Sequence, residues 1–199
     1  MKTVIVATKN NHKVKEMAAI LKGFDLELVT MTDYGIDIDI VEDGSTFEEN
    51  ALIKARTVAK LSGKCAIADD SGLSVDALFG KPGIYSARYA STDGKDASDK
   101  DNIDKLLEDM KDIPMEKRTG RFVSAIAFVF PDGKEICTLG TCEGHITREI
   151  IGNGGFGYDP VFYCTELCKT YGEMTAEEKN SISHRGRALN IFARKLAER

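Results

Sequence analysis

The sequence predicts an α/β protein built around a mixed β-sheet. Short apolar runs rich in β-branched residues alternate with helical periodicity in the N-terminal half, a pattern typical of parallel strands joined by helices. Further along, the extended runs 121–130 and 135–143 flank the turn signal Pro131-Asp132-Gly133, which indicates a long antiparallel hairpin. Parallel and antiparallel strands are therefore expected in one sheet with helices beside it.

The sequence of the N-terminal half predicts two strands and two helices. The first three elements are a strand, a helix and a strand at residues 3–7, 14–21 and 26–30. A capping box, either Ser45 with Glu48 or Thr46 with Glu49, then opens a helix that runs to about residue 61. Gly63 is well placed to end that helix.

The middle of the chain predicts a short strand, a loop and a helix. Residues 65–68 form an apolar strand that ends in a sharp polar turn at Asp69-Asp70-Ser71-Gly72. Two carboxylates are thus expected at a strand terminus. Residues 80–94 predict a structured loop, and residues 97–110 have helical periodicity.

The C-terminal part predicts a glycine-rich loop and a terminal helix. The loop spans residues 152–157, and Thr175 with Glu178 forms a capping box before the helix. Leu189, Phe192 and Leu196 supply a buried helical stripe. We see neither an internal repeat nor a linker, so residues 1–199 are expected to form a single domain.

Composition narrows the class of protein. The chain has 199 residues, 42% apolar and 30% charged, which is typical of a folded globular protein. Its apolar runs are shorter than the roughly 20 residues that span a bilayer, and it has no signal-peptide pattern, so we expect no membrane association and a cytoplasmic location. The net charge of -5 disfavours nucleic acid as a partner but permits a small anion neutralised by local lysines and a cation. The five cysteines lack zinc or redox spacing and are expected to be free thiols.

The first polar constellation follows the first strand. Thr8, Asn10 and Lys13 are spaced T-x-N-x-x-K where the loop enters a helix. Free amides at a helix N-terminus bind anions, and a hydroxyl, an amide and a lysine add donors for a phosphate chain. A plain helix cap with a solvated lysine explains the same pattern.

The second constellation surrounds the start of the next helix. Glu42 precedes it and could bind a metal, while Glu49, Asn50 and Lys54 lie close together on its first turns. An acidic first turn favoured by the helix dipole is the alternative interpretation.

The third constellation is the adjacent pair Asp69 and Asp70. Two neighbouring carboxylates repel each other unless something compensates, and magnesium prefers oxygen ligands of this kind. A turn-forming Asp-Ser-Gly sequence is the competing interpretation.

The fourth constellation lies near the C-terminus. It combines the segment 154–160, Gly-Gly-Phe-Gly-Tyr-Asp-Pro, with Lys179, Ser183, His184 and Arg185. Phe156 could stack on a base, and the basic groups could donate to carbonyl or phosphate oxygens. A glycine turn beside an ordinary basic helix end fits each piece separately.

Taken together, these motifs resemble the inosine triphosphate pyrophosphatase family along nearly the whole chain. The matching segments are Thr8-x-Asn10-x-x-Lys13, Thr46-Phe47-x-Glu49-Asn50-Ala51, Ala68-Asp69-Asp70-Ser71-Gly72-Leu73, Pro82-Gly83-x-x-Ser86-Ala87-Arg88, Gly155-Phe156-Gly157-Tyr158-Asp159-Pro160 and Glu178-Lys179-Asn180-x-x-Ser183-His184-Arg185. Residues 164–168 lack the proline and glycine often found in relatives before the Lys169-Thr170 pair.

The resemblance implies a fold and a reaction. We expect an elongated mixed sheet flanked by helices, two lobes with a central nucleotide cleft, and a homodimer. The implied reaction cleaves a nucleoside triphosphate such as ITP, dITP or XTP between its α and β phosphates, giving a monophosphate and pyrophosphate, with Mg²⁺ as cofactor.

The resemblance also implies roles for individual residues. Asp70 is the expected general base or metal-linked carboxylate, and Glu42 with Asp69 is expected to help place magnesium. The expected substrate-binding residues are Thr8, Lys9, Asn10, Asn11, His12, Lys13, Ser71, Phe156, Gly157, Tyr158, Asp159, Lys179, His184 and Arg185. Two other functions stay open, a catalytically silent nucleotide sensor and a septum-inhibition-type nucleotide pyrophosphatase.

Overall fold

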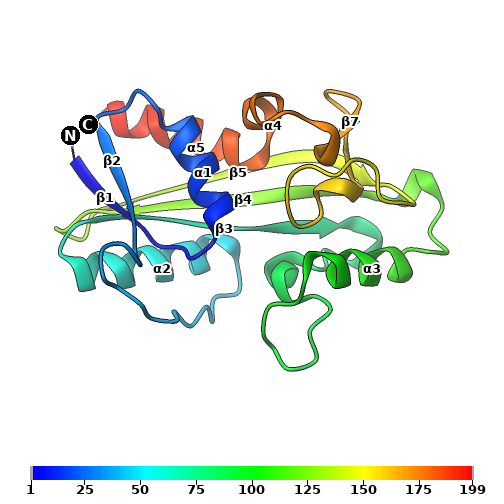
Figure 1. The fold of residues 1–199 in the computed structure, drawn as a ribbon, viewed down its shortest axis with the longest axis horizontal. Coiled ribbons are helices and arrows are strands. Elements are labelled where there is room, and N and C mark those ends of the chain that lie inside the picture. Colours follow the sequence, from blue (N-terminus) through cyan, green and yellow to red (C-terminus); the bar gives the residue numbers. More distant parts are fainter. Residues whose placement is uncertain (1, 199) are drawn as a thin grey trace. The chain divides into compact units, whose positions relative to one another are not determined.

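The computed structural model describes residues 2–198, which form a seven-stranded sheet with helices packed on it (Figure 1). The strands are β1 Lys2–Val6, β2 Leu26–Thr30, β3 Cys65–Val75, β4 Thr119–Val129, β5 Glu135–Ile146, β6 Phe162–Cys164 and β7 Lys169–Thr170. The α-helices are α1 Asn11–Ile20, α2 Phe47–Ser62, α3 Asp99–Asp109, α4 Ala176–Ile182 and α5 His184–Ala197. None of the helices within residues 2–198 is long and apolar enough to cross a bilayer.

The sheet is mixed, as the sequence predicts. Its strand order is β2-β1-β3-β4-β5-β6-β7. β1 pairs in parallel with β2 and β3, whereas β6 pairs antiparallel with β5 and β7. β4 and β5 are sheet neighbours joined by a turn in which the Phe130 amide donates to the Lys134 carbonyl at 2.9 Å. The expected hairpin is therefore confirmed.

The chain divides into two compact units. Unit 1 holds the residues up to Asp70, Ser124–Gly140 and the residues from His184 on. Unit 2 holds Ser71–Val123 and Thr141–Ser183. The expectation that residues 1–199 act as one domain stays a prediction.

Unit 1 is layered because side chains alternate along its strands. Val4 and Val6 pack with α1 and α5, in a core that includes Met17 and Phe192. Their neighbours in β1 pack instead with α2, in a core rich in alanine. Figure 1 shows α1 and α5 on one side of these strands and α2 on the other. Consecutive strand residues therefore face different helices.

β3 differs from the sequence prediction. The strand does not end in a turn after Ala68 but runs on through Asp69 and Asp70 to Val75. The predicted polar turn is wrong because both carboxylates are buried and have cationic partners, so neither has to reach solvent. The acids therefore lie within a strand.

The helix ends follow local capping chemistry. Thr46 is the N-cap of α2 and accepts from the Glu49 amide at 3.1 Å, and Gly63 ends the helix at φ +64°. The capping box of Thr175 and Glu178 is confirmed as well. The helix it opens ends at Ile182, however, and α5 starts separately at His184. The single terminal helix of the sequence prediction is thus two helices.

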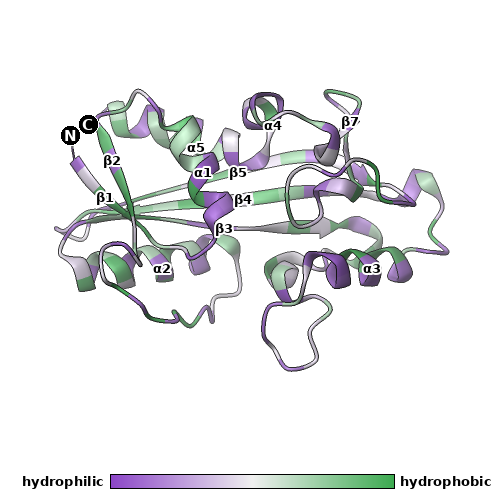
Figure 2. Cartoon of the chain, in the orientation of Figure 1, coloured by the Kyte–Doolittle hydropathy of each residue, from purple (hydrophilic) through white to green (hydrophobic). Residues whose placement is uncertain are grey.

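Unit 2 has an aromatic core and a buried arginine. The rings of Phe122, Phe162 and Tyr171 pack together, with centroids 4.7 to 5.4 Å apart. Arg118 is buried and donates to the carbonyls of Met110, Ile146 and Thr147. It thereby ties the end of α3 to the strands beside it. Figure 2 shows α3 as mostly hydrophilic along its length, consistent with a helix that buries only one face.

Candidate functional site

The loop from β1 into α1 is ordered by its own polar side chains. Asn10 is the N-cap of α1 and accepts from the amides of His12 at 2.9 Å and Lys13 at 3.2 Å. The hydroxyl of Thr8 accepts a hydrogen bond from the backbone amide of Asn10 at 3.1 Å. The helix-cap interpretation is therefore correct for Asn10. Phosphate binding by this loop, including the exposed Asn11 and His12, stays a prediction.

Lys9 contacts acidic residues of the segment that follows β2. Its ammonium lies 3.0 Å from Asp37 and 2.9 Å from Asp39, in an exposed arrangement. The hydrogen bond that Lys9 donates to Asp39, followed by the one it donates to Asp37, raises the pKa of Lys9. Lys9 thus tethers the segment that leads to Glu42.

Asp69 is a fully buried carboxylate that pairs with two cations. Lys13 Nζ lies 2.7 Å from Asp69 Oδ1, and Arg185 Nε lies 3.1 Å from Oδ2. The hydroxyl of Ser124 donates to Oδ2 at 2.6 Å. Burial opposes ionisation, but Arg185 and Lys13 outweigh it and hold the pKa of Asp69 well below its usual range. Arg185 also pairs with Glu16.

Asp70 lies in a different environment, centred on Lys54. Lys54 Nζ donates to Asp70 Oδ1 at 2.7 Å and to Glu42 Oε2 at 2.8 Å. Burial raises the pKa of Asp70 to about 6, although Lys54 and Lys13 oppose this, and the nearby Glu42 carboxylate adds to the rise. Two carboxylates share one close ammonium, so the same arrangement raises the pKa of Lys54 despite its burial.

Glu42 reaches this cluster because the chain before α2 lies close to the helix. The Gly44 amide donates to Asn50 Oδ1 at 2.9 Å. A Cβ atom at Gly44 would stand 2.7 Å from that same oxygen, so only glycine fits. Burial opposes the ionisation of Glu42, but Lys54 outweighs it and lowers the pKa of Glu42. The carboxylate therefore faces Lys54 in its charged form.

The donor groups of this cluster fit a magnesium ion bound together with a phosphate substrate. Within residues 2–198, no three His, Cys, Asp or Glu side chains gather into a set that could hold a metal alone. Mg²⁺ commonly takes one or two carboxylates and completes its shell with water and substrate phosphates. Glu42 and Asp70 converge on one cation already, Lys54, and could supply this pair. Asp69 is committed to Arg185 and Lys13, so the metal proposal continues with Glu42 and Asp70 alone.

The glycine-rich loop of unit 2 is organised by Asp159. This buried carboxylate accepts from the Phe156 amide at 2.8 Å and from Lys179 Nζ at 2.6 Å. A Cβ atom at Gly155, whose φ is +75°, would stand 2.0 Å from Asp159 Oδ2. The loop therefore requires glycine at this position.

Lys179 also lies over the ring of Phe156, with 4.6 Å between its ammonium and the ring centroid. Phe156 is half-buried, so part of its ring stays accessible to a flat ligand. Tyr158 is buried and its hydroxyl donates to the Ser86 carbonyl at 2.8 Å, and the Gly157 amide donates to Asp99. These contacts show that Tyr158 and Asp159 stabilise the structure of unit 2. Substrate contacts by residues 156–159 and Lys179 stay predictions.

The remaining predicted residues lie on β3 and at the start of α5. Ser71 is half-buried and is the first residue of unit 2. His184 and Arg185 are both buried in the first turn of α5 in unit 1. Arg185 already pairs with Asp69 and Glu16. To contact a nucleobase, it would therefore have to give up one of these ion pairs. The base-reading role of His184 and Arg185 stays a prediction.

Sequence reasoning missed three polar residues of unit 1. The sequence places Lys54 near Glu49 and Asn50 but assigns it no role, yet in the structure it joins Glu42 to Asp70. Ser124 and Glu16 belong to none of the motifs, yet Ser124 donates to Asp69 and Glu16 pairs with Arg185 beside it. In the sequence, the signal for Ser124 is that it is an isolated serine in the apolar run 122–130.

The five cysteines form no disulfide, as expected.

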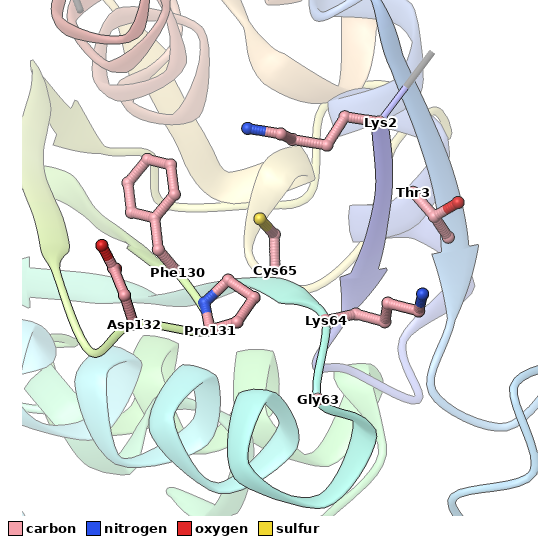
Figure 3. A pocket seen from close by; sticks show the side chains of 8 residues that line it. All are labelled: Lys2, Thr3, Gly63, Lys64, Cys65, Phe130, Pro131 and Asp132. Carbon is pink, nitrogen blue, oxygen red and sulfur yellow. The ribbon is translucent and has the colours of Figure 1, made fainter.

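A hollow of about 580 Å³ in unit 1 is separate from all of these residues (Figure 3). Its lining includes Lys2 and Thr3 at the start of β1 and Cys65 at the start of β3. Ligands of α/β sheets bind beyond the carboxyl ends of parallel strands, and this hollow lies at the amino ends. It is therefore not the candidate site.

The mixed α/β sheet and the buried carboxylate–ammonium clusters define an enzyme-like centre suited to an anionic substrate and a divalent cation. The chain belongs to the Ham1 family, whose model matches residues 4–195. It is 48% identical over its whole length to a dITP/XTP pyrophosphatase of Bacillus cereus, of which it covers 96%. It is 50% identical to a dITP/XTP pyrophosphatase of Shigella flexneri over 96% of each chain. The solved structure of a HAM1 protein from Coxiella burnetii matches with a TM-score of 0.89 and 39% identity over 100% of both chains.

Proposed function

We propose that this protein hydrolyses non-canonical purine nucleoside triphosphates, ITP, dITP and XTP, to the monophosphate and pyrophosphate, and so cleanses the nucleotide pool. The observation that carries the proposal is Asp70, a buried carboxylate whose pKa is raised to about 6 beside Lys54 and Glu42. A carboxylate of this kind acts as a base near neutral pH. Membership of the Ham1 family, with relatives named dITP/XTP pyrophosphatases, supports the choice of substrate.

In the proposed reaction, a water molecule attacks the substrate and the bond between the α and β phosphates breaks. Asp70 orients the water and accepts its proton, and pyrophosphate leaves with the electrons of the broken bond. Lys13 and the loop from Thr8 to Lys13 bind the phosphate chain. Glu42 and Asp70 would hold a Mg²⁺ ion, which would neutralise charge on the phosphates. Lys54 keeps both carboxylates in place.

For substrate recognition, we propose that Phe156 stacks on the purine and that Lys179, His184 and Arg185 supply donors near it. Hypoxanthine and xanthine present a carbonyl at position 6, whereas adenine presents an amino group. A donor that meets the amine stays unsatisfied, at a cost of about 1 to 3 kcal/mol. Two such donors give a preference for ITP over ATP of about a hundredfold or more. Guanine keeps the carbonyl, so its rejection depends on its 2-amino group.

One assay separates this function from its alternatives. The protein is incubated with ITP, XTP, GTP, ATP or dTTP and magnesium, and products are identified by chromatography. We expect IMP and pyrophosphate from ITP, and among the four purine nucleotides the lowest kcat/KM for ATP. Binding without turnover would instead identify a silent nucleotide sensor, and preference for dTTP a septum-inhibition-type pyrophosphatase. Equal turnover of ATP and ITP would exclude the pool-cleansing role.

The assembly and location follow from the same proposal. We propose a homodimer in the cytoplasm, where nucleotide pools are used, as the family resemblance suggests. Light scattering coupled to size-exclusion chromatography tests the dimer: a mass near twice 21.8 kDa supports it, and a mass of one chain contradicts it.

A further inference from the structure

Ser124 on β4 is a polar residue to which neither the motifs nor the proposed reaction assigns a role. We infer that Ser124 is a positioning residue for triphosphate binding, acting through Asp69 on Lys13. This inference rests on the proposed function, because it concerns the residue that binds the phosphate chain.

The first step of the argument is the crowding around Asp69. Its Oδ1 accepts from Lys13 at 2.7 Å and from Arg185 Nη2 at 3.2 Å. Its Oδ2 accepts from Arg185 Nε at 3.1 Å and from the Ser124 hydroxyl at 2.6 Å. The side chain of Asp69 is 0% exposed. Its charge is therefore compensated only by groups of the protein around it.

The second step is that one of these donors has access to a ligand. The side chain of Lys13 is 15% exposed, whereas that of Arg185 is 1% exposed. Lys13 also lies in the first turn of α1, directly after the predicted phosphate loop. It is therefore the donor that can turn from Asp69 to a phosphate.

The third step is the cost of that movement. When Lys13 turns to a phosphate, Asp69 loses one donor and relies more on those that stay, among them Arg185 and Ser124. A buried carboxylate that loses donors is destabilised, and hydrogen bonds to a charged group are stronger than neutral ones. Ser124 thus lowers the cost of releasing Lys13 to the substrate.

The surroundings of Ser124 support this assignment. Ile126 and Phe128 lie on the same face of β4 as Ser124, and both belong to the apolar core against α1 and α5. A hydroxyl in such a row costs free energy unless it is hydrogen-bonded. Its described acceptor is the carboxylate of Asp69.

The test compares two ligands in calorimetry. Ser124→Ala is made in an Asp70→Asn background, which prevents turnover, and ITP and IMP are titrated in the presence of magnesium. We expect the Kd for ITP to rise about tenfold, as the loss of a hydrogen bond to a charged group implies, and the Kd for IMP to change less than about twofold. Ser124→Cys, similar in size and a weak donor, is expected to fall between serine and alanine.

Thr138→Val is the matched control. Thr138 is also buried in unit 1, and its hydroxyl donates to the Ala188 carbonyl of α5 at 2.9 Å, away from any charged group. Thr138→Val should weaken the binding of neither ITP nor IMP selectively. Equal losses for ITP and IMP in Ser124→Ala, or no loss, would overturn the inference. If Ser124→Ala does not fold, Ser124→Cys must show the selective loss. Wild-type protein that binds ITP without hydrolysing it would contradict the proposed function and leave the calorimetric comparison intact.

Discussion

Asp69 and Asp70 are neighbours in sequence but lie in opposite environments. Side chains alternate along β3, so Asp69 meets Lys13 of α1 and Arg185 of α5, whereas Asp70 meets Lys54 of α2. On the first side, two cations and Ser124 surround one carboxylate. On the second side, two carboxylates share one ammonium.

The pKa values follow from this count of charges. Excess positive charge holds the pKa of Asp69 well below its usual range, despite burial. Burial and the second carboxylate raise that of Asp70 to about 6. A carboxylate that already accepts from several donors is a poor base, and one with fewer donors is a better base and a better metal ligand. The difference assigns structure and positioning to Asp69 and chemistry to Asp70.

The largest expected effect is on catalysis by Asp70→Asn. The substitution removes charge and basicity but keeps the shape, so the protein should fold while turnover of ITP falls at least about a hundredfold. Initial rates of pyrophosphate release measure this loss. A near-normal rate would remove Asp70 from the mechanism.

Asp69→Asn should act mainly on stability. It removes the buried charge that Arg185 and Lys13 share, and breaking such a pair costs about 3 to 5 kcal/mol. Urea unfolding measures the change. The control is Asp76→Asn, which breaks a pair with Arg121 that is 3.0 Å long but partly exposed, and should cost no more than about 1 kcal/mol. Equal costs for the two variants would contradict the distinction.

Lys13→Ala should weaken triphosphate binding more than monophosphate binding. The lysine addresses the phosphate chain, and IMP lacks most of that charge. We expect a loss of about tenfold for ITP, as for one charge-assisted hydrogen bond, and a smaller loss for IMP. Calorimetry with both ligands measures the difference. Equal losses would place Lys13 away from the β and γ phosphates.

The two carboxylates should also give opposite pH dependences of stability in metal-free protein. The folded pKa of Asp69 lies below its unfolded value, so its contribution is present above about pH 4 and is lost as the pH falls. The folded pKa of Asp70 is about 6, so its ionisation costs stability as the pH rises from about 4 to 6. Relative to its Asn variants, wild-type protein should gain stability from Asp69 as the pH rises towards about 4, and should lose stability from Asp70 as the pH rises further to about 6. Parallel slopes in urea unfolding would contradict the assignment.

Much of the fold was predictable because its signals are local. Apolar periodicity located the helices and most strands, and the Thr175–Glu178 capping box was visible in the sequence. The course of β3 was not predictable, because the groups that neutralise Asp69 come from positions 56 and 116 residues away. For the same reason Ser124, 55 residues from Asp69, carried no recognisable role. The motifs single out Asp69 and Asp70 but do not show that the two side chains face different helices.

The most direct test of the account measures unfolding free energy and ITP turnover on the same three proteins, wild type, Asp69→Asn and Asp70→Asn. The account predicts that Asp70→Asn keeps most of its stability and loses turnover, whereas Asp69→Asn loses several kcal/mol of stability, about the cost of a broken buried ion pair. Under conditions where Asp69→Asn is still folded, it should keep a larger share of kcat than Asp70→Asn. If Asp69→Asn loses as much kcat as Asp70→Asn while remaining as stable as wild type, the two carboxylates share the chemistry and the account is contradicted.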